Sequence, residues 1–333
     1  MPRRGPAPIE RVTARAYTGS HESACASPAA RNRPAGAGVH APVRPSLLAL
    51  LLAACHGGPR SLPAHTPSDA RAPIVLTYLG VAGWQLDAGP TTILVDPYYS
   101  RPADLDGPLA PDPAAIAARA PARADLIVVG HSHVDHVLDA PAVANATGAL
   151  LVGSDSTARL ARASGVPADR VLAIHGGEDI ARDGWSVRVV PSLHSKLDDD
   201  SLGGEIAADP QLPLRFGDYA EGGTFAYLVE VAGHQVLFLG TANFIEPELT
   251  GLRPDVAVIA TGLRERVDDY TCRLLNALGR PPRVYANHFD DWHGPPVDAP
   301  VDEDLQAFVA EVERCAPGTE VVVPRHFAPM RVP

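Results

Sequence analysis

The chain has 333 residues, of which 46% are hydrophobic, enough for one large core or for two domains. Its first 54 residues hold seven arginines and two acids, which leaves 21 basic and 37 acidic residues in the remainder, a net charge of about −16. So acidic a body lacks the basic surface that neutralises nucleic-acid phosphates. We therefore expect a small-molecule substrate and no nucleic-acid partner.

The first 54 residues divide into a polar head and a short apolar run. Residues 1–45 are rich in Ala, Pro, Arg and Gly without apolar periodicity, which predicts disorder. The run that follows has about eight apolar residues, too few to span a bilayer but suited to a signal-peptide core. It ends in Leu52-Ala53-Ala54-Cys55, which resembles the lipobox of bacterial lipoproteins, and residues 55–73 are typical of a flexible tether.

The lipobox resemblance implies cleavage before Cys55, lipidation of that cysteine, and a lipid-anchored protein of the bacterial cell envelope that faces the periplasm. Membrane contact would then be through the lipid anchor only. The alternative is a cytoplasmic protein whose extension contains an incidental leucine run.

From residue 74 onward, short strands alternate with helices, which predicts an α/β layer fold. Expected strands cover 74–79, 83–88, 91–95, 126–129, 150–152, 186–190, 224–231, 235–239, 256–259, 283–285 and 320–323. Expected helices cover 113–118, 140–146, 156–164, 269–278 and 302–314. Asp139, followed by Pro141, is the expected N-cap of the second of these helices.

The sequence H-S-H-V-D-H at residues 131–136 follows a predicted buried strand. In an extended stretch His131, His133 and Asp135 point the same way, and we expect the chain to turn at His136. Imidazole and carboxylate groups are the ligands that zinc and similar divalent ions prefer in catalytic sites. The alternative is a chance cluster of surface histidines or helix caps. The motif predicts a metal site.

This H-x-H-x-D-H motif resembles the central motif of the metallo-β-lactamase superfamily, and the likeness extends over residues 74–323. The strand that ends in Asp96 is similar to the one that precedes the metal loop in that superfamily. Ser-Leu-His194-Ser resembles the third motif, and Ala-Asn-His288-Phe resembles the last. The sequences of these motifs most resemble those of the lactonase-like branch that includes ascorbate-6-phosphate lactonase.

The resemblance implies a four-layer αββα sandwich for residues 74–333, with two mixed sheets face to face. It also implies that His131, His133 and His194 hold a first metal, and that Asp135, His136 and His288 hold a second. Zinc is the expected metal, as one ion or two, and manganese and iron remain open. Asp96 is expected to be structural or to contact a ligand.

The sequence departs from the superfamily pattern at one position. An aspartate that bridges the two metals usually follows a strand, and Thr241 stands there instead. Two nearby cations need anionic ligands between them. Either one metal is bound tightly, or another carboxylate supplies the charge, for which Asp290 and Asp291 are the candidates. Both could equally lie in a solvated loop or contact His288.

Residues 195–223 lack a regular pattern, and a loop of this length is usually functional or mobile. It begins beside His194, so it forms either a wall over the metal or an acidic surface loop. Arg215, Phe216 and Tyr219 are its residues that could touch a substrate. Elsewhere, Cys272 and Cys315 lie in predicted helices, either bonded to each other or as two buried thiols.

The predicted activity is hydrolysis of an ester, lactone, amide or phosphodiester bond by a metal-bound hydroxide, with Asp135 as the group that accepts or passes a proton. Thr241 motivates an alternative, a non-catalytic binding or structural lipoprotein on a hydrolase scaffold. A true β-lactamase is the third hypothesis and the least favoured, because superfamily membership alone does not give an antibiotic site.

Overall fold

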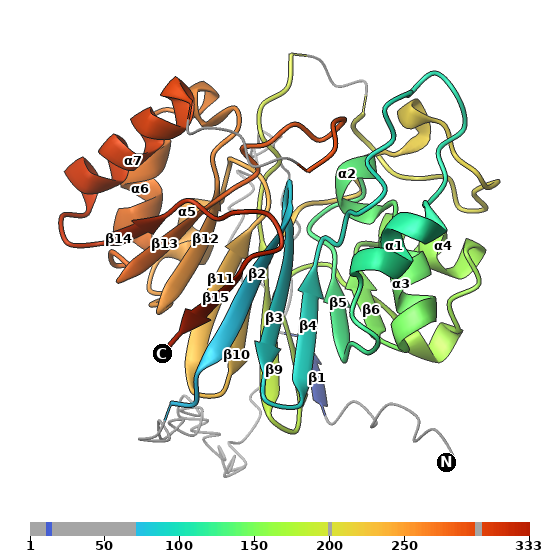
Figure 1. The fold of residues 1–333 in the computed structure, drawn as a ribbon, viewed down its shortest axis with the longest axis horizontal. Helices are drawn as coiled ribbons and strands as arrows, with labels where there is room; N and C mark the ends of the chain where they lie inside the picture. Colours follow the sequence, from blue (N-terminus) through green and yellow to red (C-terminus); the bar gives the residue numbers. More distant parts are fainter. Residues whose placement is uncertain (1–10, 15–70, 199–201, 297–301) are drawn as a thin grey trace, which may run out of the picture. The chain divides into compact units, whose positions relative to one another are not determined.

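Two mixed β-sheets lie face to face, and helices cover the outer surface of each (Figure 1). The computed structural model describes residues 11–14, 71–198, 202–296 and 302–333. One half of each sheet is antiparallel and the other half is parallel. The four-layer αββα sandwich that the sequence predicts is confirmed.

The first sheet has the strand order β15-β2-β3-β4-β5-β6-β7. Its strands are β2 (Ile74–Gly80), β3 (Gly83–Ala88), β4 (Thr91–Val95), β5 (Leu126–Val128), β6 (Leu150–Gly153), β7 (Val171–Ala173) and β15 (Pro329–Val332). Strands β4 to β7 pair in parallel, and β5 and β6 are buried along their whole length. Both faces of these strands are covered, which explains their unbroken apolar sequences.

The second sheet has the order β1-β8-β9-β10-β11-β12-β13-β14. Its strands are β1 (Arg11–Ala14), β8 (Glu178–Arg182), β9 (Trp185–Pro191), β10 (Phe225–Val231), β11 (His234–Leu239), β12 (Val256–Ala260), β13 (Arg283–Asn287) and β14 (Glu320–Val322). Strands β11 to β14 are the parallel half.

The outer layers consist of short helices. Over the first sheet lie α1 (Pro113–Arg119), α2 (Val134–Val137), α3 (Ala140–Thr147) and α4 (Asp155–Ala163), and over the second lie α5 (Glu246–Leu249), α6 (Tyr270–Ala277) and α7 (Glu303–Cys315) (Figure 1). Three apolar cores result, one between the sheets and one beneath each helical layer. Trp84 is fully buried between the sheets, where its indole Nε1 donates to Asn287 Oδ1 at 2.9 Å.

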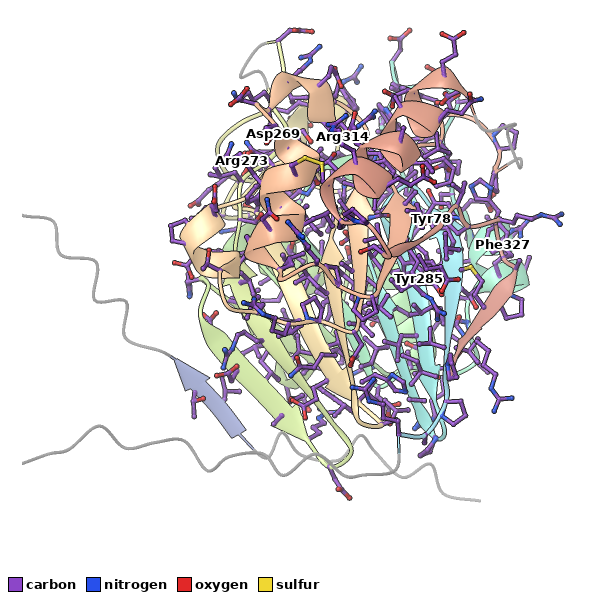
Figure 2. The ribbon with its side chains drawn as sticks, turned by 90° about the vertical axis from the view of Figure 1, so that its left-hand side faces the viewer. Tyr78, Asp269, Arg273, Tyr285, Arg314 and Phe327 are labelled. Atoms are coloured by element: carbon purple, nitrogen blue, oxygen red, sulfur yellow. A yellow bond between two sulfur atoms is a disulfide. The ribbon has the colours of Figure 1, made fainter. Side chains whose placement is uncertain are left out.

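A disulfide joins Cys272 of α6 to Cys315 of α7, across 43 residues of sequence (Figure 2). The sequence left this pairing open. Both helices pack on the same side of the second sheet, and their apolar faces share a core that includes Leu274 and Phe308. The bond therefore fixes two neighbouring helices of one layer.

The expected strands and helices are found, most of them within one or two residues of their predicted bounds. The sequence missed strands such as β8, in which Ile180 is the one large apolar residue and the other four residues are polar or small. It also missed β15, an edge strand that contains a proline, and the single-turn helix α2. Short elements give too few residues for a hydrophobic period.

Two expectations need correction. Residues 11–14 form β1, which pairs antiparallel with β8, so the disorder predicted for residues 1–45 does not hold there. Asp139 makes no capping hydrogen bond to α3, because its carboxylate accepts from the backbone amides of Tyr99 and Ser100 and from the Ser100 hydroxyl. The signal-like run, Cys55 and most of the tether at 55–73 lie outside the described residues.

None of the helices in the described part of the chain is both long and apolar enough to cross a membrane.

Candidate metal centre

Loops that follow several strands bring the predicted ligands together. Asp96 follows β4, residues 131–136 follow β5, His194 follows β9, and His288 follows β13. Clefts at the carboxyl ends of parallel strands are where α/β folds place their sites. The motif at 131–136 is extended only as far as His133, since α2 begins at residue 134. Asp135 and His136 therefore lie on the first turn of α2 and not on the extended stretch with His131 and His133, so the chain turns earlier than the sequence predicts.

The three histidines of the first cluster surround one point. The ring centroids of His131, His133 and His194 are 4.6 Å apart in all three pairs. His131 Nε2 lies 3.1 Å from His133 Nδ1, and one nitrogen from each ring lies within 4.8 Å of the others. Three imidazoles in this arrangement resemble the protein ligands of a catalytic zinc site that keeps a position open.

Hydrogen bonds fix the protonation of two of these rings. His133 Nε2 lies 3.2 Å from the Leu202 carbonyl oxygen, and His194 Nδ1 lies 2.8 Å from the Ser195 carbonyl oxygen. A carbonyl only accepts, so each of these nitrogens carries the proton and the opposite nitrogen presents its lone pair. Such a partner normally sets the tautomer of a metal-binding histidine.

The second cluster contains a carboxylate. Asp135 Oδ2 lies 3.2 Å from His288 Nε2 and 3.5 Å from His136 Nε2. The ring centroids of His136 and His131 are 3.8 Å apart, so the two clusters adjoin. Together they offer five imidazoles and one carboxylate, a donor set that fits first-row divalent ions.

Asp96 positions His136. Its Oδ2 accepts from His136 Nδ1 at 2.8 Å, and its Oδ1 accepts from the backbone amide of Gly130 at 2.6 Å. A Cβ at Gly240 would lie 3.0 Å from Asp96 Oδ2, so a glycine lets this carboxylate fit there. Asp96 thus directs His136 Nε2 toward Asp135 and increases the basicity of the ring.

Burial and neighbouring charges shift the histidine pKa values in opposite directions in the two clusters. Burial, reinforced by the neighbouring histidines, lowers the pKa of His131 well below its usual value and that of His194 to about 4. Burial also lowers the pKa of His136, but Asp135 and Asp96 outweigh it, so that pKa is raised. Burial would raise the pKa of Asp135, yet His136 and His288 hold it low. At neutral pH His131 and His194 are thus free to bind a metal, and Asp135 is anionic.

Comparison with known proteins places the chain in a family. Residues 75–273 match the model of the beta-lactamase superfamily domain. A UPF0173 metal-dependent hydrolase of Anaeromyxobacter sp. (strain K) is 30% identical over 269 residues, which cover 77% of this chain and 89% of that protein. The chain belongs to the UPF0173 metal-dependent hydrolases of the β-lactamase superfamily. It is therefore an enzyme of that class, and the alternative of a non-catalytic binding or structural protein is set aside.

Two further likenesses agree with this assignment. A UPF0173 metal-dependent hydrolase of Methanopyrus kandleri is 28% identical over 253 residues, which cover 74% of this chain and 95% of that protein. The solved structure of Igni18, a metallo hydrolase from Ignicoccus hospitalis, has a TM-score of 0.55 at 20% identity and covers 79% of this chain and 99% of that one. The structural likeness concerns the fold.

Thr241, which stands where the resemblance implies a bridging aspartate, is neutral and binds a neighbouring loop. Thr241 Oγ1 accepts from the backbone amide of Ser195 at 2.8 Å and lies 2.7 Å from Ser195 Oγ. Ser195 Oγ in turn accepts from the backbone amide of Ala242 at 2.7 Å. Thr241 therefore anchors the residue next to His194, and it brings no negative charge to the cavity that it lines.

Asp290, one of the two candidate replacements for the bridge, is fully engaged elsewhere in this hydrolase. Its Oδ1 accepts from the Tyr78 hydroxyl at 2.6 Å and from the Val81 amide at 2.7 Å. Its Oδ2 lies 3.0 Å from an Arg101 guanidinium nitrogen and 2.9 Å from His326 Nε2. Four donors occupy both oxygens, so Asp290 fastens the loop that carries His288 to three other segments.

Asp291, the other candidate, faces solvent. Its side chain is 69% exposed and accepts from the backbone amide and ring of His293. Arg101 and His326, which hold Asp290, were not recognised as site residues in the sequence. Neither belongs to a motif, and only the fold brings them to Asp290 across 189 and 36 residues.

A cavity of about 410 Å³ opens over both clusters. His133 and His194 of the first cluster and all three residues of the second line it. The loop at 195–223 contributes Leu197, Leu202, Phe216 and Tyr219 to its walls. Of the three loop residues expected to touch a substrate, Arg215 lies apart, because its guanidinium donates to the Asp106 carbonyl.

Proposed function

We propose that this hydrolase cleaves an ester, lactone, amide or phosphodiester bond of a small molecule with the help of zinc held by the two clusters. The observation that carries the proposal is the convergence of neutral imidazole nitrogens beneath a cavity of substrate size. His131, His133 and His194 would hold one ion, and Asp135, His136 and His288 would hold a second or orient the substrate.

A bound zinc ion supplies a water molecule of lowered pKa and polarises the bond to be cleaved. Side chains of the protein would transfer the proton and orient the ligands. Asp135 is anionic at neutral pH and lies at the cavity, so it can accept a proton from the attacking water and pass it to the leaving group. Asp96 keeps the neighbouring His136 in one orientation throughout.

We further propose that the two clusters bind metal with unequal strength. The first combines three imidazoles, two of them held in one tautomer by carbonyl oxygens. In the second, Asp135 is the only anionic ligand, and Thr241 adds no charge between the sites. Repulsion between two cations at neighbouring sites would then weaken the second ion.

For location, we propose export to the cell envelope with a lipid anchor at Cys55. The disulfide between Cys272 and Cys315 supports an oxidising compartment, and the lipobox-like sequence supports the anchor. Cleavage before Cys55 would remove β1 and leave β8 as the sheet edge. N-terminal sequencing of the native protein tests this: a modified Cys55 is expected, and an intact Met1 would favour the cytoplasmic alternative.

Chelator-sensitive turnover tests the activity. The zinc-loaded full chain would be assayed on p-nitrophenyl butyrate, γ-butyrolactone and bis-p-nitrophenyl phosphate. We expect turnover of at least one that stops with chelator and in His133→Ala. His175→Ala is the matched control, because His175 is exposed and pairs only with acids outside both clusters. Turnover that survives chelation would contradict the proposal.

A further inference from the structure

The walls of the cavity above the metal clusters are apolar. Apart from the candidate ligands, large apolar side chains dominate the lining: Leu197, Leu202, Phe216, Leu263, Phe289 and Trp292. They come from the loop after β9, from the turn after β12 and from the segment after β13. A cavity with apolar walls and a polar floor binds the non-reacting part of a ligand by burial and orients its reacting group.

Two aromatic rings form a continuous part of this wall. Phe216 and Trp292 lie with ring centroids 5.7 Å apart and planes 13° apart, an offset-stacked arrangement. They come from separate loops, so the fold brings them together beside the clusters. A flat or alkyl group packed on this pair would lose its contact with water at little entropic cost, because both rings already support each other.

Within the described residues, no arginine or lysine lines this cavity. The two lining carboxylates outside the clusters, Asp290 and Asp304, are paired with Arg101 and Arg264, whose guanidinium groups are thereby used within the protein. A phosphate or distal carboxylate seated against these walls would lose water without gaining a charged partner, which is unfavourable.

Two exposed leucines lie at the rim near the first cluster. Leu193 and Leu197, which flank His194 in the chain, are 45% and 42% exposed. A second hollow of about 460 Å³ adjoins His133 and His194, and it contains one lysine, Lys196, together with the acidic Glu221. Charges of opposite sign there give an anion no net attraction.

We infer that the non-reacting part of the substrate is an uncharged aromatic or alkyl group that binds against Phe216 and Trp292. The inference rests on the proposed function and narrows it, because it removes substrates with an anionic distal group, such as phosphorylated lactones, from the substrate class. In an ester or lactone of this kind, water adds across the acyl–oxygen bond, and a carboxylic acid and an alcohol are formed.

Kinetics with matched p-nitrophenyl esters test the inference. The 3-phenylpropanoate, butyrate and hemisuccinate esters share their leaving group and differ in an aromatic, an alkyl and a charged acyl end. On the zinc-loaded full chain we expect kcat/KM to fall in that order, with the hemisuccinate at least tenfold below the butyrate. Equal or faster hydrolysis of the hemisuccinate would overturn the inference while leaving metal-dependent hydrolysis intact.

Substitutions test whether the cavity wall is responsible for the preference among these esters. Trp292→Ala is expected to raise KM for the phenylpropanoate about tenfold and to change kcat little, and Trp292→Phe should restore most of the affinity. Leu197→Arg should raise kcat/KM for the hemisuccinate several-fold. Leu212→Arg is its matched control, since Leu212 is 41% exposed and does not line the cavity. Equal effects of the two arginines would contradict the assignment.

A binding measurement separates this inference from the activity. Tryptophan fluorescence of chelator-treated protein would be titrated with 2-phenylethanol and with phenethyl phosphate, so that no metal–anion contact contributes. The neutral compound should change the emission, and Trp292→Phe should abolish the change, since Trp84 and Trp185 are buried away from the cavity. Tighter binding of the phosphate would overturn the inference even if no ester is hydrolysed.

Discussion

The two candidate metal clusters differ in charge although they share one cavity. The first offers three imidazoles with ring centroids at equal distances, and burial keeps the pKa values of His131 and His194 low. The second centres on the anionic Asp135, which lies against His136 and His288. The first cluster therefore offers a metal three well-placed neutral imidazoles, whereas metal binding at the second cluster depends on the charge of Asp135.

The surroundings extend this difference. Backbone carbonyl oxygens orient His133 and His194, whereas the Asp96 carboxylate orients His136. Thr241, which stands where the resemblance implies a bridging aspartate, lines the same cavity, and its hydroxyl binds Ser195. A second ion thus meets one anionic ligand and no anionic bridge, so we expect the first ion to be required for turnover and the second to be weak.

The largest contrast should come from ligand removal. His133→Ala leaves the first cluster two imidazoles, so activity should drop to the level of chelator-treated protein. His288→Ala leaves the first cluster intact, so a smaller loss is expected, and excess zinc should not restore it. Steady-state kinetics over a zinc titration check both variants. Equal losses would break the distinction between the clusters.

Next in size is the effect of breaking the network behind His288. Asp290→Asn leaves the buried Arg101 without its carboxylate, and breaking a buried ion pair costs about 3–5 kcal/mol in unfolding free energy. Urea unfolding measures this. Asp291→Asn is the matched control because its side chain is exposed, and it should change little. Similar stability of the two variants would contradict the structural role of Asp290.

Asp96→Asn is expected to act on the second cluster alone. The amide keeps the size of the side chain but removes the charge that orients His136, and loss of such a partner typically costs 10–100-fold in metal affinity. Isothermal titration with zinc should show the weaker site weakened further and the tighter site unchanged. Weakening of both sites would show that the clusters act as one unit.

Thr241→Asp should reduce the difference in zinc affinity between the two clusters. The carboxylate can still accept from the Ser195 amide, and it places a negative charge at the position of the superfamily's bridge. We expect the second zinc to bind at least tenfold more tightly, a change of about 1.4 kcal/mol. Thr241→Asn, of nearly the same size but neutral, should leave the second site weak.

The smallest expected effect is on the acid stability of the metal-free protein. His194 has a pKa of about 4 in the fold and about 6.5 when unfolded, so below pH 6.5 the unfolded chain binds the extra proton. Its contribution to stability is complete above pH 6.5 and is lost as pH falls toward 4. His136 acts oppositely, since its raised pKa favours the fold at lower pH.

Thermal unfolding between pH 4 and 7 checks the sign. His194→Gln should flatten the acid side of the pH profile relative to the wild type. A steeper loss of stability in the variant would contradict the assignment of the acid dependence to this ring.

Much of the fold and of the ligand set could be predicted from the sequence because both depend on local patterns. Strands such as β5 and β6 are unbroken apolar runs, and the spacing of residues 131–136 marks the motif by itself. Long-range contacts were not predictable in this way. The partners of Asp290 come from Tyr78, Arg101 and His326, which no period or spacing connects.

Side-chain direction was the other limit. Asp290 and Asp291 are adjacent acids after His288, yet one is buried among four donors and the other faces solvent. The early start of α2 likewise separates Asp135 from His131 and His133, with which an extended stretch would align it, although the resemblance implied its place in the second cluster. Both outcomes depend on backbone turns set by packing.

The most direct test is the metal content of the zinc-loaded full chain after dialysis against a weak chelator, with His194→Ala beside it. The account predicts one tightly held zinc per wild-type chain and less than half an equivalent in the variant. Two tightly held ions in the wild type would contradict the weak second site. Equal retention by both proteins would contradict the first cluster as the principal metal site.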